Sequence, residues 1–293
     1  MCQLDQPFFQ FVGDLPQKIA PPQVNDKLKF VGLKKQMTNP NAAVLYSVEG
    51  GIARITMNRP EKRNALNDEL IGGLKEELRR ADHDEEVRVA ILSGAGQDFC
   101  SGADLAALQK ISTATVSENL ADARSLMELF LLIRAVRVPV ISAVQGRALA
   151  GGCGLALACD MVLAARKARF GFPEVKIGFV PAMVTAILRR NTPEKRAFEL
   201  LTLGSEISAD EAATYGLVNT VLDDEAFDDE LDVFAHQFEK VSGSAVSLSK
   251  RLFYEGDAMT FKDALECGVD TNVLARMSRD CQEGVNRFLN RKK

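Results

Sequence analysis

The chain has 293 residues, of which 46% are hydrophobic, and its 36 basic and 40 acidic residues give a formal net charge of −4. This length and apolar content suit one large α/β domain or two smaller ones with a sizeable core. The acidic balance disfavours a general affinity for nucleic acid or for an anionic membrane, and no run of about 18 apolar residues predicts a membrane-spanning helix. Because the N-terminus lacks the pattern of a targeting sequence, we expect a cytoplasmic protein that acts on small molecules.

The cysteines and histidines argue against two classes of catalytic site. No two of the six cysteines have C-x-x-C spacing, and only His83 and His236 are available to join them, so we expect no bound metal. Neither histidine lies near a glycine-rich turn or a serine elbow. We therefore expect both to be surface residues, which disfavours a hydrolase with a Ser-His-Asp triad.

The first 36 residues show no hydrophobic periodicity and contain Pro21-Pro22. We interpret residues 1–36 as an N-terminal extension, either a flexible arm or sequence upstream of a native start at Met37. An α/β pattern fills residues 37–225, and helical patterns dominate residues 226–293. This distribution predicts an α/β core followed by a C-terminal helical region.

The core opens with a predicted hairpin, V-L-Y-S-V and I-A-R-I-T-M, around the turn E-G-G. Asn67 is placed to cap a helix with three leucines spaced by four residues, and V-R-V-A-I-L-S-G then indicates a buried strand. A helix over about residues 117–135, the strand V-P-V-I-S-A-V-Q-G, a helix from Gly151 and the strand D-M-V-L-A-A continue the alternation. Strands and helices therefore alternate as far as residue 180.

Beyond residue 180 the pattern is mainly helical. Thr192-Pro193-Glu194 predicts a helix start with proline at its first position, and Ser208 with Glu211 has the spacing of a capping box. Only L-V-N-T-V is predicted as a strand in this part of the chain. Residues 224–290 are expected to form three or four amphipathic helices.

Two glycine-bearing turns each follow a predicted strand. One contains Gly102-Ala103-Asp104, and the other is R-A-L-A-G-G-C-G at residues 147–154, where the apolar run after Gly151 indicates a helix start. The free N–H groups of a helix start can hold a phosphate, stabilise an oxyanion or form a tight packing corner. Both turns can meet at one sheet edge, where converging N–H groups are suited to polarising a carbonyl oxygen.

Four motifs stand in a fixed order along the chain: N-R-P-E-K-R-N-A-L at 58–66, F-C-S-G-A-D-L at 99–105, A-V-Q-G-R-A-L-A-G-G-C-G at 143–154 and F-G-F-P-E-V-K-I-G-F-V-P at 170–181. Together they resemble the crotonase superfamily, which is the enoyl-CoA hydratase/isomerase family, from about residue 43 to the C-terminus. The resemblance implies a spiral α/β core of stacked β-β-α turns and a helical C-terminal region that forms homotrimers or hexamers. It also implies acyl-CoA substrates, with CoA entering as part of the substrate and no separate cofactor.

Carried over by motif, the resemblance assigns catalytic roles to Ala103, Gly151 and Glu174. The backbone N–H groups of Ala103 and Gly151 would form an oxyanion hole for the thioester oxygen, and Glu174 would act as acid and base. Gly152 and Gly154 are then expected to be packing residues.

The resemblance also implies residues that bind the substrate. Those along the nucleotide are Lys62, Arg63 and Ala65, and those along the pantetheine are Ser101, Gly102 and Asp104. Phe288 and Arg291 match positions that reach the CoA of a neighbouring subunit, and a solvated basic tail is the alternative interpretation of that segment.

The chain departs from the family's hydratases at Gly154, where they have a second glutamate. We rank hydration of a 2-enoyl-CoA first, including a branched one as in leucine breakdown, because F-G-F-P-E-V-K-I-G-F-V-P-A-M-V is similar to the methylglutaconyl-CoA hydratase-like branch. Asp104, Asp122 and Glu128 are then candidates for a compensating acid. Migration of a double bond by Glu174 alone is the alternative, and a non-catalytic acyl-CoA-binding protein is the third hypothesis.

Overall fold

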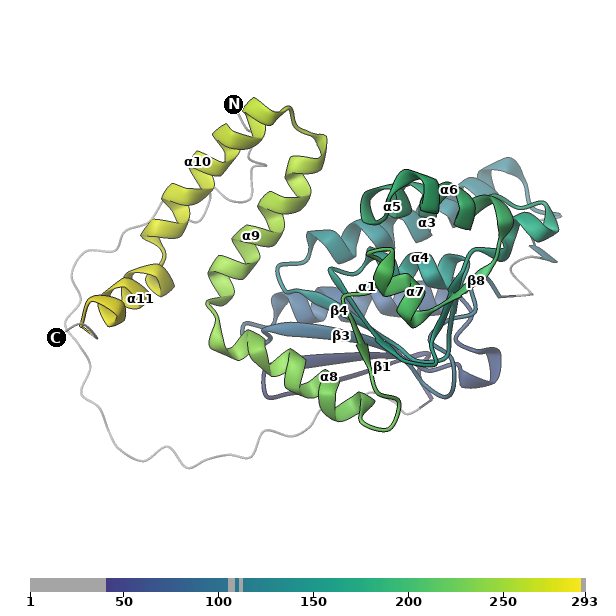
Figure 1. The fold of residues 1–293 in the computed structure, drawn as a ribbon, viewed down its shortest axis with the longest axis horizontal. Coiled ribbons are helices and arrows are strands. Elements are labelled where there is room, and N and C mark those ends of the chain that lie inside the picture. The colour runs from purple at the N-terminus through teal and green to yellow at the C-terminus, as the bar shows by residue number, and fades with distance from the viewer. Residues whose placement is uncertain (1–40, 105–108, 111–112, 291–293) are drawn as a thin grey trace.

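The computed structural model describes residues 41–104, 109–110 and 113–290 (Figure 1). The expected N-terminal extension and Arg291 lie outside the described residues. The described part contains two sheets, in which helices and strands alternate, and a C-terminal series of helices. This arrangement confirms the predicted α/β class.

The larger sheet has six strands in the order β1-β2-β3-β4-β6-β9. They are β1 (Val44–Glu49), β2 (Ile52–Met57), β3 (Val89–Gly94), β4 (Val140–Val144), β6 (Met161–Ala165) and β9 (Thr220–Leu222). The first two strands form the predicted antiparallel hairpin, and the later strands are parallel to their neighbours. Along β3, Ala90 and Leu92 join one hydrophobic core and Val89 and Ile91 the other, so the sheet is buried on both faces.

Helices cover both faces of this sheet. Apolar side chains of α1 (Asp68–His83), α3 (Val116–Ala135) and α4 (Gly151–Ala158) are part of the larger core. The predicted cap of α1 is confirmed, because Asn67 accepts a hydrogen bond from the N–H of Leu70 at 2.9 Å. The opposite face is covered by α8 (Phe227–Ala235), which buries Phe227 and Leu231.

A second, smaller sheet corrects one prediction. Its strands, in the order β5-β7-β8, are β5 (Arg147–Leu149), β7 (Arg169–Gly171) and β8 (Glu206–Ser208). The sequence pattern predicts only L-V-N-T-V as a strand beyond residue 180, so β8 is an additional strand. Three residues are too few to show a period of two, and β8 forms because Ile207 pairs with Phe170 of β7 and is buried there.

Three further helices connect these strands: α5 (Ala182–Asn191), α6 (Glu194–Leu203) and α7 (Ala209–Thr214). The predicted capping box begins α7, where the Ser208 hydroxyl accepts from the N–H of Glu211 and the Glu211 carboxylate accepts from the N–H of Ser208. Helix α6 starts one residue later than predicted. Pro193 is its N-cap and has an extended ψ of 141°, so the first helical residue is Glu194.

The C-terminal helices α9 (Gly243–Glu255), α10 (Phe261–Met277) and α11 (Arg279–Asn290) form an extension that we call the C-terminal arm. Together with α8 they agree with the predicted three or four helices. In Figure 1, α10 and α11 lie beyond α9, away from the sheets. Lys250 of α9 is buried against the core, and its Nζ lies 2.7 Å from Oδ2 of Asp160.

Candidate active site

The turn at residues 102–104 is held by backbone pairing with Leu66. The N–H of Leu66 donates to the carbonyl of Gly102 at 2.7 Å, and the N–H of Asp104 donates to the carbonyl of Leu66 at 3.0 Å. Successive residues of an extended chain point their N–H groups to opposite sides. The N–H of Ala103, which lies between these two bonds, therefore points away from Leu66, and Ala103 is exposed.

The second turn presents the first N–H of a helix. Gly151 is the first residue of α4, so its N–H belongs to the groups that have no acceptor within the helix. Ala150 before it has a φ of 52° and a ψ of −129°, a conformation that L-residues seldom adopt. The N–H of Ala150 donates to the carbonyl of Gly171 at 2.8 Å, which anchors this strained residue to β7.

The structure brings the two turns together. A Cβ atom placed on Gly102 would lie 2.8 Å from Cβ of Ala150 and 3.7 Å from the backbone nitrogen of Gly151. Only glycine allows this approach, and its φ of 95° also favours glycine. The N–H groups of Ala103 and Gly151 therefore belong to adjoining turns, as the pattern of two glycine-bearing turns predicts.

The other two glycines of α4 make close packing contacts. A Cβ on Gly152 would lie 2.4 Å from the carbonyl oxygen of Cys100, and one on Gly154 would lie 2.6 Å from Cγ2 of Val184 and 3.4 Å from Cζ of Phe130. Position 152 therefore excludes a side chain, because it lies against backbone. A side chain at 154 would have to displace Val184 of α5, and it would also contact Phe130 of α3.

Glu174 lies in the short helix η3 (Pro173–Ile177) and is half-buried. Its Oε2 atom is buried and has no hydrogen-bond partner among the described residues. Burial raises the pKa of the Glu174 carboxyl. Burial also raises the pKa of the Cys153 thiol on α4, and the nearby charge of Glu174 adds to this rise. A carboxylate with this environment is a suitable general base.

The three candidates for a compensating acid differ in their surroundings. Asp104 forms an ion pair with Arg59, whose Nη2 lies 2.7 Å from Oδ2. Glu128 is exposed and accepts a hydrogen bond from Lys75, which lowers the pKa of its carboxyl and makes it a weak acid donor for this site. Asp122 lines a cavity that Asp104 also lines.

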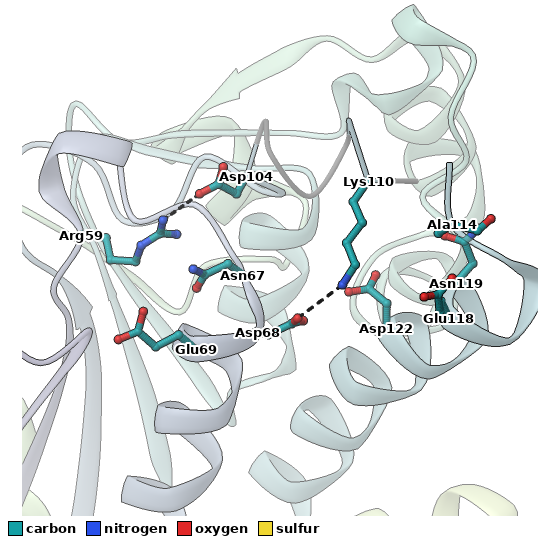
Figure 2. Close-up of a pocket in the computed structure, with 10 residues that line it drawn as sticks. All are labelled: Arg59, Asn67, Asp68, Glu69, Asp104, Lys110, Ala114, Glu118, Asn119 and Asp122. Atoms are coloured by element: carbon teal, nitrogen blue, oxygen red, sulfur yellow. Dashed lines mark hydrogen bonds and ion pairs between the residues drawn. The ribbon is translucent and has the colours of Figure 1, made fainter. Parts of the chain in front are cut away.

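This cavity has a volume of about 420 Å³ and lies between the start of α1, the start of α3 and the turn at Asp104 (Figure 2). Its described lining residues are Arg59, Asn67, Asp68, Glu69, Asp104, Lys110, Ala114, Glu118, Asn119 and Asp122. Besides the Arg59–Asp104 pair it contains an ion pair of 3.8 Å between Lys110 and Asp68. The charged side chains that line the cavity are therefore predominantly acidic.

The segment predicted to meet the nucleotide lies around the short helix η2 (Pro60–Lys62). Lys62 and Arg63 are exposed, whereas Ala65 is buried and its carbonyl accepts from Nη1 of Arg59 at 2.5 Å. The carbonyl of Arg63 accepts from the N–H of Ser101 at 3.0 Å, so this segment and the turn at residues 102–104 form one unit.

Sequence reasoning missed three residues of this region: Arg59, Asn64 and Val184. Asn64 is fully buried with a φ of 52°, and its amide donates to the carbonyls of Ala95 and Asp98. Arg59 and Asn64 lie in the N-R-P-E-K-R-N-A-L motif, so the sequence contained a local signal for both. Val184 had no such signal, because its contact with Gly154 joins two different helices. Phe288 lies exposed on α11 of the C-terminal arm.

In the described part of the chain, no helix is both long enough and apolar enough to span a membrane. Both histidines are exposed, as predicted.

The chain from residue 47 to residue 293 matches the family described as enoyl-CoA hydratase/isomerase. It is 35% identical to the crotonyl-CoA hydratase of Syntrophomonas wolfei, covering 85% of this chain and 96% of the relative. It is 34% identical to the 1,2-epoxyphenylacetyl-CoA isomerase of Escherichia coli, covering 84% and 95%. The solved structure of an enoyl-CoA hydratase from Mycobacterium smegmatis is similar with a TM-score of 0.81 and 32% identity, covering 85% of this chain and 96% of that one. The protein therefore has the crotonase fold and belongs to the enoyl-CoA hydratase/isomerase family of enzymes.

Proposed function

We propose that this enzyme takes a proton from the carbon next to a CoA thioester and returns it two carbons further along the acyl chain, which shifts a double bond, with Glu174 as its single acid/base group. The N–H groups of Ala103 and Gly151 would hold the thioester oxygen while it carries the negative charge of an enolate. The positive end of the α4 dipole would favour the same charge. In this reaction one carboxylate removes a proton from one carbon and returns it to another.

The packing at Gly154 is the observation that carries this proposal. Hydration delivers a hydroxyl group to one carbon and a proton to the next, which two carboxylates sharing a water molecule accomplish directly. At Gly154 the second carboxylate is absent, and the Cβ atom of any side chain there would lie 2.6 Å from Cγ2 of Val184. We therefore rank isomerisation above hydration, the reverse of the order that the sequence favours.

The environment of Glu174 supports its role in either reaction. Its half-buried carboxyl has a raised pKa and a buried oxygen without a partner among the described residues. A desolvated carboxylate binds a proton more readily than an exposed one, which suits abstraction of a weakly acidic proton next to a thioester.

Hydration of a 2-enoyl-CoA is the second proposal. It is supported by the likeness to the crotonyl-CoA hydratase of Syntrophomonas wolfei. Asp122 is the candidate that would supply its second acid group, because it is exposed and lines the cavity beside Asp104. A branched acyl group of the methylglutaconyl type is among the substrates to be tested.

Binding of the CoA part is proposed for the residues that precede and form the two turns. The exposed charges of Lys62 and Arg63 would pair with the phosphates, Ala65 would lie near the nucleotide, and the backbone of Ser101 and Gly102 would meet the pantetheine. Phe288, and Arg291 outside the described residues, are proposed to reach the CoA of a neighbouring subunit.

Self-association as a homotrimer or hexamer is proposed for the C-terminal arm. Exposed apolar side chains recur at every fourth residue of α10, at Leu265, Val269, Val273 and Met277. A contiguous row of exposed apolar side chains is typical of a surface that another protein chain covers. A cytoplasmic location stays a prediction.

The test is to incubate the purified protein separately with crotonyl-CoA, 3-methylglutaconyl-CoA and a straight-chain 3-enoyl-CoA while following the absorbance of the conjugated thioester. Isomerisation of the 3-enoyl-CoA raises this absorbance, whereas hydration of the conjugated substrates lowers it. Conversion of crotonyl-CoA with no conversion of 3-enoyl-CoA would reverse our order. Binding of all three without turnover would favour the non-catalytic hypothesis.

A further inference from the structure

Arg59 and Asp104 form an ion pair directly beside the proposed oxyanion hole. Only 16% of the Arg59 side chain and 12% of the Asp104 side chain are exposed. Figure 2 shows the guanidinium of Arg59 pointing toward the Asp104 carboxylate at the edge of the cavity. The second guanidinium nitrogen, Nη1, donates to the carbonyl of Ala65. One side chain thus joins the predicted nucleotide segment to the turn that carries Ala103.

Arg59 is itself held firmly. Its backbone N–H donates to Oδ1 of the buried Asn64 at 2.9 Å, and Asn64 is anchored to the carbonyls of Ala95 and Asp98. The turn at Asp104 is consequently fixed twice, by its backbone bond to Leu66 and by its side-chain pair with Arg59. A group held in this way cannot turn toward solvent without breaking several hydrogen bonds.

Asp104 also presents an electrostatic problem that Arg59 solves. Asp104 follows Ala103 directly in the chain. The backbone N–H of Ala103 would donate to the thioester oxygen, which becomes negative during the reaction. Like charges at short distance in a poorly solvated site repel one another strongly. Because Arg59 neutralises Asp104, the Asp104 carboxylate does not oppose the build-up of negative charge at the Ala103 N–H.

We propose that Arg59 is a positioning residue for the oxyanion hole, which neutralises Asp104 and fixes the turn so that the Ala103 N–H faces the thioester oxygen. This inference rests on the proposed oxyanion hole. Arg59 acts through Asp104 and Ala65 and touches no reacting atom in this role.

The experiment compares Arg59→Gln, Asp104→Asn and the double variant in the full-length protein. Arg59→Gln removes the positive charge that faces the Asp104 carboxylate, so kcat should fall roughly 100-fold, as after loss of one oxyanion donor, with KM nearly unchanged. The double variant removes both charges, so it should recover at least about 10-fold of that loss. Arg59→Lys keeps the charge but has one donor group in place of a fork, and it should give an intermediate kcat.

A second readout uses binding alone. A conjugated enoyl-CoA bound in the oxyanion hole absorbs at longer wavelength because its carbonyl is polarised. This shift should be smaller in Arg59→Gln and restored in the double variant. Arg54→Gln is the matched control, since Arg54 also pairs with an aspartate, Asp232, but on the sheet away from the two turns. It should keep the wild-type kcat and spectral shift.

Three results would overturn the inference: equal kcat values for Arg59→Gln and the double variant, an unchanged spectral shift in Arg59→Gln, or a loss that appears in KM rather than kcat. If Arg59→Gln does not fold, kcat and the spectral shift are compared between Arg59→Lys and the wild type. Unchanged values of both in Arg59→Lys would then overturn the inference. Failure of the proposed oxyanion hole is distinguishable, because the wild type itself would then show no spectral shift, whichever reaction it catalyses.

Discussion

A Cβ atom on Gly154 would lie 2.6 Å from Cγ2 of Val184, closer than van der Waals contact between carbon atoms of different residues allows. Val184 of α5 can therefore keep its position only because residue 154 of α4 is glycine. Any side chain introduced at 154 alone must displace Val184 or Phe130, and overpacking of this kind destabilises a core by about 1–3 kcal/mol.

The first prediction follows from this contact. Gly154→Ala should lower the free energy of unfolding by about 1–3 kcal/mol, and Val184→Ala added to it should recover part of that loss because the two side chains then fit. Urea unfolding of the wild type, both single variants and the double variant measures the coupling. Additive losses from the two substitutions would show that the contact is not tight in solution.

Substitutions at Gly154 and Val184 should also change which reaction the enzyme catalyses. Gly154→Glu with Val184→Gly gives a second carboxylate the space that it lacks in the wild type, so the ratio of hydration to isomerisation should rise. In the isomerase, the added charge should also raise the pKa of Glu174 by repulsion and move the pH profile of isomerisation upward. A double variant that isomerises with the wild-type pH profile and gains no hydration would show that residue 154 does not face the reacting carbons.

The second prediction concerns Glu174→Gln. The amide keeps the shape of the side chain but cannot accept a proton, so turnover should fall by about 10²–10⁴-fold while acyl-CoA binding is kept. A calorimetric titration with a non-reacting acyl-CoA checks binding, and the thioester assay checks turnover. Retention of more than about a tenth of wild-type activity would mean that another group is the principal base.

The raised pKa of Glu174 gives a pH dependence with a definite sign. The base must be ionised, so kcat/KM should fall as the pH drops through this raised pKa and reach a plateau above it. For stability, burial favours the protonated carboxyl in the folded state, and this contribution is lost as the pH rises through the folded pKa. Glu174→Gln should therefore unfold at a slightly higher temperature than wild type at pH 7, and this difference should disappear in acid, below the unfolded pKa. A difference that is constant across pH would contradict the effect of burial.

The third prediction tests the attachment of the C-terminal arm. Nζ of Lys250 pairs with Asp160 and donates to the carbonyls of Ile133 and Val138 at 2.8 Å. Lys250→Met leaves the Asp160 charge buried and unpaired, which should lower the free energy of unfolding by about 3–5 kcal/mol. Adding Asp160→Asn should recover part of this loss, whereas two independent losses would show that the pair is not coupled. Urea unfolding of Lys250→Met, Asp160→Asn and the double variant measures the coupling between the two side chains.

The fourth prediction concerns the apolar face of α10. Val269→Glu places a charge in the proposed subunit contact, so sedimentation should show a smaller particle than for wild type. Val233→Glu on α8 is the matched control, because Val233 is 71% exposed and Val269 64%. The control should sediment like wild type. An unchanged particle size for Val269→Glu would place the subunit contact elsewhere.

The fifth prediction concerns residues 1–36, which lie outside the described structure and outside the family match from residue 47. A chain that starts at Met37 should keep the thermal midpoint, particle size and activity of the full chain. Aggregation of the shortened chain, or a change in its sedimentation, would show that the extension packs on the core.

The sequence by itself determined the elements whose signals are local. The hairpin of β1 and β2, the Asn67 cap and the Ser208–Glu211 capping box each depend on residues within a few positions of one another, and all three are confirmed. The two glycine-bearing turns were recognisable for the same reason, since a strand, a glycine and an apolar helix are neighbours in the chain.

Only the tertiary structure decided what depends on distant partners. β8 is a strand because β7 pairs with it, not because of its own three residues. Arg59 and Asp104 are 45 positions apart, so their ion pair has no local pattern. The contact of Gly154 with Val184 exists because two helices pack closely. This packing is the reason for ranking isomerisation above hydration when the second glutamate is absent. Close packing of side chains depends on the shape of the whole core, and no single segment of the sequence specifies that shape.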